Sequence, residues 1–272
     1  MTKTDTPGSR APDLQSFSDP VEAAARMPSL AEDERRADIG HTLRGTVVCV
    51  LGMHRSGTSY LIGSLQKSGL FLGTHFDWNP YNQRGNRENP EVFTLHEDLL
   101  ASNGGSWENP PEVVTWASYH FDRARALLSK YAGDGPWGFK DPRTLLILSG
   151  WKRVTNDIRF VGIFRSPIAV AHSLHLRNGT PLERAMRLWN HYNRLLLDEY
   201  ERQPFPVICF DWHEDVLHEK INTIVTALGL RAIDRNNRFF ASDLRHYHDS
   251  AENHLPEESI AIYRRLQSIS LR

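Results

Sequence analysis

Glycine, serine and arginine gather in one short stretch of the chain that is suited to binding an anion. Residues 52–59 read Gly-Met-His-Arg-Ser-Gly-Thr-Ser, and an apolar, β-branched run at residues 46–51 precedes them. Glycines allow a tight turn in which successive backbone N–H groups converge on one point, and the N-terminus of a following helix adds partial positive charge. The stretch therefore predicts a cradle for a phosphate or sulfate group, with a plain glycine turn as the alternative.

The same stretch differs from a nucleotide-kinase loop at one decisive position. In the Walker A pattern, G-x-x-x-x-G-K-[ST], the lysine precedes the final hydroxyl residue, but here Thr58 stands in its place. The cation is instead Arg55, inside the loop. A P-loop phosphotransferase needs that lysine near the terminal phosphates, usually together with Mg²⁺. A nucleotide kinase or other P-loop phosphotransferase is therefore the less favoured alternative.

Two further clusters follow runs that are expected to be strands. Arg165 ends one run, and Ser173 lies eight residues later in the expected helix. Lys140 and Arg143 end another run, where they add positive charge, and Asp141 between them is placed to orient either one. Taken singly, the first pair is also explained as a capping arginine with an unrelated serine, and the second cluster as a salt-bridged turn.

Together the three clusters resemble those of the sulfotransferase family that uses 3′-phosphoadenosine 5′-phosphosulfate (PAPS). The Arg-Ser-Gly-Thr-Ser segment at residues 55–59 resembles the family's loop for the 5′-phosphosulfate. Arg165 with Ser173 resembles the pair that binds the 3′-phosphate. The Lys-Asp-Pro triplet at residues 140–142 is similar to that of tyrosylprotein sulfotransferases and many bacterial sulfotransferases. The resemblance covers about residues 47–173.

This resemblance implies a role for each cluster. Arg165 and Ser173 would select the 3′-phosphate, which distinguishes PAPS from ATP. Lys140 and Arg55 would stabilise charge on the bridging oxygen as it leaves, with the electrostatic logic of phosphoryl transfer. Family members need no metal, and the sequence has no HxxxH or CxxC spacing. The residues that would hold the 5′-phosphosulfate are Arg55, Ser56, Gly57, Thr58 and Ser59.

The acceptor hydroxyl needs a general base. Cytosolic sulfotransferases carry a histidine after the strand that corresponds to residues 137–140, where this chain has the Lys-Asp-Pro triplet instead. In tyrosylprotein and many glycan sulfotransferases the base is a glutamate after the first helix, and residues 85–89, Gly-Asn-Arg-Glu-Asn, resemble that segment. Glu88 is therefore the expected base, with a plain surface acid as the alternative interpretation. Other candidates for the base are His96, Glu97, Asp98 and Asp141.

Alternating strand and helix patterns are expected to position these residues. Strands separated by helices indicate βαβ units, hence an α/β fold with a P-loop-NTPase-like parallel sheet and helices on both faces. Ligands of such sheets bind beyond the carboxyl ends of the strands, where all three clusters lie. Hydrophobic periodicity and capping signals predict strands at 46–51, 137–140, 159–164 and 207–210, and helices at 58–67, 90–102, 121–131, 167–176, 181–202 and 215–228.

Composition and charge exclude several classes of protein. The 272 residues carry 32 Lys and Arg against 33 Asp and Glu, a net charge of −1, which argues against a nucleic-acid binder. Cys49 and Cys209 lie in apolar runs and are expected to be buried thiols. No secretory leader or transmembrane run is visible, so a cytoplasmic protein is expected. Residues 1–42 are expected to form a flexible or partly helical arm before a sulfotransferase domain at 43–272.

The sequence gives fewer indications of the acceptor than of the donor. Its recognition is expected in loops such as 74–120 and 230–272. A carbohydrate-type hydroxyl is the first expectation, and a peptide tyrosine or small metabolite stays open, as does a non-catalytic PAP- or PAPS-binding protein. The sequence gives no oligomeric state.

Three tryptophans are expected either to line the acceptor cleft or to anchor the core, namely Trp107, Trp116 and Trp137. Three basic residues are candidates for closing over the nucleotide: Arg245, His246 and His248. A set at helical spacing is expected to be core: Leu182, Ala185, Trp189, Tyr192 and Leu196.

Overall fold

The fold is built on a small parallel sheet. A computed structural model describes residues 45–77, 85–132, 135–234, 239 and 255–271; the expected arm at residues 1–42 and the three C-terminal basic residues, Arg245, His246 and His248, lie outside them. Within the described residues the sheet has four strands in the order β2-β1-β3-β4, all parallel. The strands are β1 (Val47–Leu51), β2 (Trp137–Lys140), β3 (Ile158–Phe164) and β4 (Val207–Cys209).

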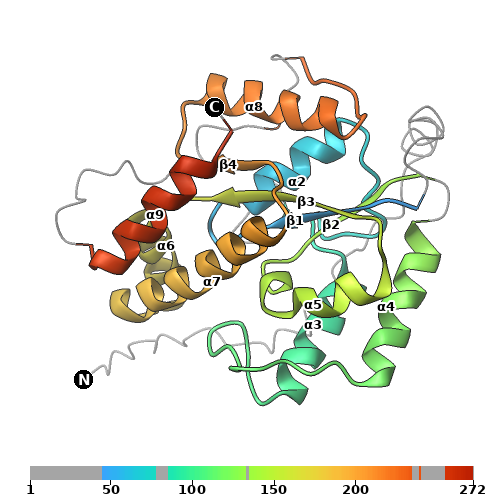
Figure 1. Ribbon diagram of the computed structural model, residues 1–272, viewed down its shortest axis with the longest axis horizontal. Coiled ribbons are helices and arrows are strands. Elements are labelled where there is room, and N and C mark those ends of the chain that lie inside the picture. The colour runs from blue at the N-terminus through green and yellow to red at the C-terminus, as the bar shows by residue number, and fades with distance from the viewer. Residues whose placement is uncertain (1–44, 78–84, 133–134, 235–238, 240–254, 272) are drawn as a thin grey trace, which may run out of the picture.

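Helices cover both faces of this sheet (Figure 1). One face carries α2 (Thr58–Lys67) and α8 (Glu214–Ala227), which contact each other. The other face carries α3 (Pro90–Ser102), α4 (Ser118–Tyr131), α5 (Thr144–Val154), α6 (Pro167–Asn178), α7 (Leu182–Arg202) and α9 (Glu257–Ile269). The expected α/β fold, with a parallel sheet covered by helices on both faces, is therefore confirmed.

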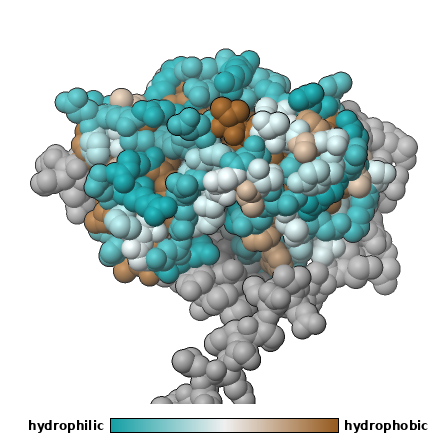
Figure 2. Space-filling view, turned by 90° about the horizontal axis from the view of Figure 1, so that it is seen from below, coloured by the Kyte–Doolittle hydropathy of each residue, from teal (hydrophilic) through white to brown (hydrophobic). Residues whose placement is uncertain are grey.

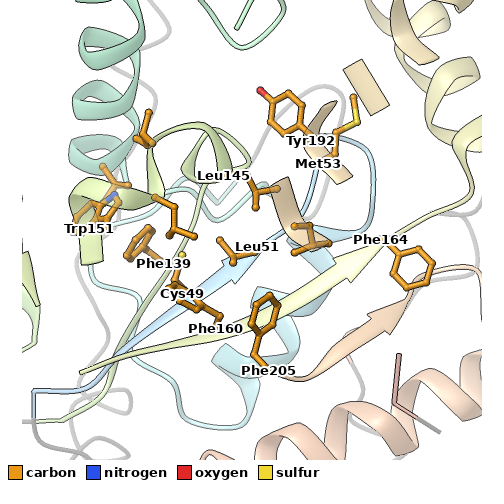
Figure 3. Close-up of a cluster of buried hydrophobic side chains, with 14 of the residues drawn as sticks. Cys49, Leu51, Met53, Phe139, Leu145, Trp151, Phe160, Phe164, Tyr192 and Phe205 are labelled. Carbon is orange, nitrogen blue, oxygen red and sulfur yellow. The ribbon is translucent and has the colours of Figure 1, made fainter. Parts of the chain in front are cut away.

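The side chains of β1 explain why both faces must be covered. Val48 and Val50 join the apolar cluster under α2 and α8, whereas Val47, Cys49 and Leu51 join the larger cluster on the opposite face. Figure 3 shows the larger cluster, in which Phe139 and Phe160, the strand partners of Cys49, lie around its thiol. A strand that is apolar on both faces is stable only when both faces are buried.

The strand order places the site. The chain passes from β1 outward to β2 and then returns across β1 to β3, so its direction of winding reverses between β1 and β3. Ligands of open α/β sheets bind at such a switch point, outside the carboxyl ends of the strands. Register pairs Val50 with Lys140 and Leu51 with Gly162, so the loops after β1, β2 and β3 leave from the same edge.

Two expectations about the helices need correction. Helices α5 and α9 were not expected, and α9 lies within residues 230–272, where a loop was expected. Leu182 is 44% exposed at the start of α7 and is not a core residue, because the first turn of that helix projects beyond the packed layer; the other four members of its set are buried: Ala185, Trp189, Tyr192 and Leu196. The remaining strands and helices lie within a few residues of the expected bounds.

The surface is mainly polar. The face seen in Figure 2 is largely hydrophilic, with apolar side chains scattered over it. No helix in the described part of the chain is both long and apolar enough to cross a membrane.

Helix α5 provides a test of the core. A Cβ added at Gly150 would lie 1.9 Å from the ring of Trp116, which itself packs against Trp151. An alanine in mid-helix normally gains about 0.5–1 kcal/mol over glycine, but overpacking of a buried ring costs about 1–3 kcal/mol. Because a contact of 1.9 Å puts the overpacking cost at the upper end of this range, we expect Gly150→Ala to lower the free energy of unfolding by about 2 kcal/mol in urea titrations. Ser149→Ala, at the exposed neighbouring position, should leave it unchanged or raise it.

Candidate active site

The loop between β1 and α2 has the backbone geometry of an anion cradle. Arg55 and Gly57 have positive φ values, 67° and 89°. Such left-handed residues within a turn make a concave row of backbone N–H groups. A Cβ at Gly57 would lie 2.4 Å from the ring of Phe210, and one at Gly52 would lie 2.4 Å from the carbonyl oxygen of Ile163. The chemistry of the loop therefore depends on glycine at both positions.

Helix α2 begins at the end of this loop with an uncapped first turn. Gly57 is its N-cap, and no side chain accepts a hydrogen bond from the first-turn amides. The Ser56 hydroxyl is buried and has no hydrogen-bond partner among the described residues. Unsatisfied N–H groups and the partial positive charge of a helix N-terminus suit the oxygens of a phosphate or sulfate group.

Arg165 emerges from β3 beside the cradle with part of its guanidinium unsatisfied. Its Nε donates to Asp211 Oδ1 at 3.2 Å, and the other oxygen of Asp211 accepts from the N–H of Ser166 at 2.6 Å. The Arg165 side chain is only 6% exposed, and its Nη2 is buried without a hydrogen-bond partner in the described part of the chain. A buried cationic donor without an acceptor is costly, so this position suits an anionic ligand.

Arg55 and Ser173 meet although they are 118 residues apart in the sequence. The Nε of Arg55 donates to the Ser173 hydroxyl at 2.8 Å. Burial, followed by repulsion from Arg177 and Arg165, lowers the pKa of Arg55 to about 10, so this guanidinium stays charged at neutral pH. Arg177 lies one turn after Ser173 on α6. The structure therefore brings the two expected donor-binding clusters together and adds Arg177, which sequence reasoning missed.

Lys140 and Glu88 form a buried ion pair. Lys140 Nζ donates to Glu88 Oε1 at 2.6 Å, with 2% of the lysine side chain and 9% of the glutamate side chain exposed. Asn86 donates to the other carboxylate oxygen at 2.8 Å. Asn89 fixes the turn, since its side chain accepts from the first amides of α3. The interpretation of Glu88 as a surface acid is wrong, because β2 supplies its partner.

A cavity of about 290 Å³ joins the cradle to this ion pair. Its wall combines charged groups from the cradle, β2 and α6 with two aromatic rings. The lining residues are His54, Arg55, Thr58, Ser59, Asn86, Glu88, Phe93, Trp107, Lys140, Pro142, Arg143 and Arg177. A cation next to a carboxylate, both bordering a cradle for an anion, can support transfer of a charged group to a hydroxyl that the carboxylate deprotonates.

A buried network fixes Arg143 at the rim of the cavity. Asp141 Oδ1 accepts from the backbone N–H and from Nη1 of Arg143, at 2.9 and 3.0 Å, and Asp141 Oδ2 lies 3.0 Å from His96 Nδ1. Trp151 donates its indole N–H to His96 Nε2 at 2.9 Å. Because an indole can only donate, the proton of a neutral His96 lies on Nδ1 and points at Asp141. Glu97 accepts from the Nε of Arg143.

The other expected bases lie outside the lining of the cavity. His96 and Asp141 are buried and bonded within this network, and neither lines the cavity. Glu97 is paired with Arg143, and Asp98 is paired with Arg123. Glu88 is the carboxylate that borders the cavity.

The tryptophans divide between core and cavity. Trp137 stacks on Tyr131 and is fully buried, and Trp116 is 8% exposed and packs against Trp151, so neither lines an acceptor cleft. Trp107 does line the cavity, together with His54. Sequence reasoning assigned no role to His54, although its place inside the cradle was the available signal.

Comparison with known proteins does not assign the chain to a family. No family model matches the chain, and no curated protein matches it. Among solved structures, the sulfotransferase domain from the Synechococcus PCC 7002 olefin synthase is similar with a TM-score of 0.49 and 18% identity, covering 85% of this chain and 90% of that chain. At this level of similarity the likeness carries no argument about activity. No group of three or more potential metal-ligating side chains occurs in the described residues.

The Asp141 network gives a stability test. Arg143 and the hydrogen bond from His96 hold the pKa of Asp141 well below its usual range, against the effect of burial. A depressed carboxylate pKa stabilises the fold above the unfolded-state pKa of about 3.9, and this contribution is lost as the pH falls below that value. We expect Asp141→Asn to lower the free energy of unfolding by about 3–5 kcal/mol at pH 7.

Urea titrations at several pH values check this expectation. The difference between wild type and Asp141→Asn should shrink by about 1.4 kcal/mol for each pH unit below about pH 4. Asp122→Asn, which removes an exposed carboxylate on α4, should change stability by less than about 0.5 kcal/mol. A difference that is small at pH 7, or that does not depend on pH, would contradict the network.

Proposed function

We propose that this protein is a sulfotransferase that moves the sulfuryl group of PAPS to an acceptor hydroxyl. The observation that carries the proposal is the hydrogen bond from Arg55 to Ser173. It joins the anion cradle after β1 to the helix after β3, and the Lys140–Glu88 pair borders the same cavity. Two anion-binding centres beside one potential general base suit a donor that carries phosphate at two positions.

The donor would lie across the carboxyl edge of β1 and β3. The cradle residues Ser56, Gly57, Thr58 and Ser59, with Arg55, would hold the 5′-phosphosulfate, and Arg165 with Ser173 would hold the 3′-phosphate. The buried, unpaired atoms Ser56 Oγ and Arg165 Nη2 support this placement, because each needs a partner that the described protein residues do not supply.

The transfer would proceed by in-line attack at sulfur. The acceptor oxygen forms a bond to sulfur while the bond from sulfur to the bridging oxygen breaks, and 3′-phosphoadenosine 5′-phosphate (PAP) leaves. Lys140 and Arg55 would stabilise the charge that develops on the leaving oxygen. An ammonium has three N–H donors, and Lys140 uses one of them on Glu88. Glu88 would take the proton of the acceptor hydroxyl.

A carbohydrate-type hydroxyl is the first acceptor to test, and a peptide tyrosine and a small metabolite hydroxyl are the others. A P-loop phosphotransferase would instead use ATP, for which the threonine at the lysine position gives no support. A protein that binds PAP or PAPS without turnover would keep the donor site and lack the role of Glu88.

Nucleotide affinity tests the donor site. PAP and AMP differ only by the 3′-phosphate, so we expect PAP to bind at least 100-fold more tightly in calorimetry. Charge-assisted hydrogen bonds contribute about 1.5–3 kcal/mol each, and Arg165→Ala should remove about 10- to 100-fold of the PAP affinity while changing AMP affinity little.

Two further variants serve as controls for this measurement. Arg159→Ala removes an exposed arginine at the opposite end of β3 and should bind PAP like wild type. Ser173→Ala gives the same direction of change as Arg165→Ala without unpairing Asp211. Equal affinity for PAP and AMP in the wild-type protein would overturn the proposed function.

The role of Glu88 is tested by Glu88→Gln. Glutamine has one carbonyl oxygen that can still accept from Lys140, but it cannot take a proton, so we expect kcat to fall about 10²- to 10⁴-fold with PAP affinity within twofold of wild type. Glu91→Gln, on α3 and bonded to Tyr131 and Lys130, should keep wild-type kcat. A loss of PAP affinity without a loss of kcat would make Glu88 only the counter-ion of Lys140.

A further inference from the structure

His54 forms part of the cavity wall that the proposed transfer does not use. It lies between Met53 and Arg55 in the cradle and borders the cavity. Its ring stacks on Trp107, with ring centres 4.2 Å apart at 35°, and meets Tyr192 edge-on at 6.1 Å. Its Nδ1 is buried and has no hydrogen-bond partner among the described residues. An imidazole that lines a cavity and has an unpaired nitrogen can form a hydrogen bond with a polar group of a ligand.

Trp107 is held rigidly in this wall. Tyr192 donates its hydroxyl to the carbonyl oxygen of Trp107 at 3.0 Å. The next residue, Glu108, accepts from Asn178 at its carboxylate and from Arg184 at its carbonyl oxygen, at 3.1 and 3.2 Å. The loop that follows α3 is therefore hydrogen-bonded to both α6 and α7. A flat indole fixed in this way offers a preformed face to a ring.

The charges around His54 decide its protonation. Burial, followed by the nearby Arg143, Lys140 and Arg177, lowers the pKa of His54 well below its usual value, against the opposing effect of Asp141. The imidazole is therefore neutral at physiological pH and offers one donor and one acceptor. A neutral imidazole brings no charge to the site of the anionic donor, whereas it can both donate to and accept from a hydroxyl group.

We propose that His54 is an acceptor-specificity residue, which hydrogen-bonds an uncharged ring compound that bears the hydroxyl and packs against Trp107. This inference rests on the proposed function, because it assigns the part of the cavity that the donor's anionic groups do not need. Phe93, with the Arg143 guanidinium 4.6 Å from its ring centre, contributes a second aromatic ring to the same cavity.

The experiment uses 4-nitrophenyl β-D-galactopyranoside, a neutral probe that combines hydroxyl groups with a flat ring. In steady-state transfer from PAPS, we expect His54→Ala to raise the KM for the glycoside about 10-fold or more, with kcat within threefold and PAP affinity within twofold of wild type. Such a pattern identifies binding that is equal in the ground state and the transition state. His54→Gln, which keeps an N–H donor and an acceptor, should recover part of the loss. Trp107→Ala should raise the same KM.

His213→Gln is the matched control, because His213 is 77% exposed at the start of α8 and does not border the cavity; it should keep the wild-type KM. If His54→Ala does not fold, His54→Gln and Trp107→Ala still carry the measurement. An unchanged KM in the His54 variants, or an equal loss of PAP affinity, would overturn the inference. So would a wild-type protein that binds PAP yet neither transfers to the glycoside nor binds it, as followed by tryptophan fluorescence. Wild-type protein that fails to prefer PAP over AMP would overturn the proposed function itself.

Discussion

Repulsion among one buried and two half-buried guanidinium groups is the constraint on which the site depends. Folding brings Arg55, Arg165 and Arg177 together from three segments, and the first of these has its pKa lowered by burial and by the other two. Like charges in a partly buried site repel strongly because the effective dielectric constant is low. The fold bears this repulsion since the sheet and α6 hold the three groups in place, and an anion between them would convert the repulsion into attraction.

A second buried network provides the rigid side of the cavity. Asp141, at the end of β2, satisfies Arg143 from one oxygen and meets His96 with the other, while Trp151 fixes the far side of that imidazole. The hydrogen bonds among Asp141, His96 and Trp151 thus connect the end of β2 to α3 and α5. Lys140 directly precedes Asp141, so the same network that anchors the turn also fixes the backbone from which Lys140 reaches Glu88. Electrostatic catalysis needs this kind of fixed placement, because a cation that must reorganise during the reaction gains less.

Features that depend on neighbouring residues could be predicted from the sequence, whereas features that depend on contacts between distant segments could not. The glycines of the cradle and the Asn-Pro start of α3 carry their own geometry, so the cradle and the turn around Glu88 were predictable from the sequence. The partner of Glu88 was not, since Lys140 is 52 residues away and reaches Glu88 only through tertiary packing. Helix α5 begins with four consecutive apolar residues at 145–148 and contains Gly150, and a short apolar run does not distinguish a helix from a strand. His54 gained its role only when the loop after α3 folded back and set Trp107 against it.

The cavity wall combines charged side chains with neutral rings, and the topology determines which elements supply them. The cationic groups Arg55, Arg165 and Lys140 lie at or just after the ends of strands, where helix N-termini and backbone amides also gather, so this edge suits the anionic donor of the proposed function. His54 and Trp107 face the same cavity, but Trp107 is supplied by a connection between helices, which changes more easily than a strand end. Under the proposed function, the part of the acceptor wall that Trp107 supplies could therefore change without altering the cationic edge. His54 and Arg55 are adjacent in the cradle, but their side chains make different contacts. The His54 ring packs against Trp107, whereas the Arg55 guanidinium donates to Ser173. The backbone of the cradle therefore links the two groups of residues. A shift of this loop would disturb both contacts together, which explains why its conformation is held by two glycines that no larger residue can replace without collision.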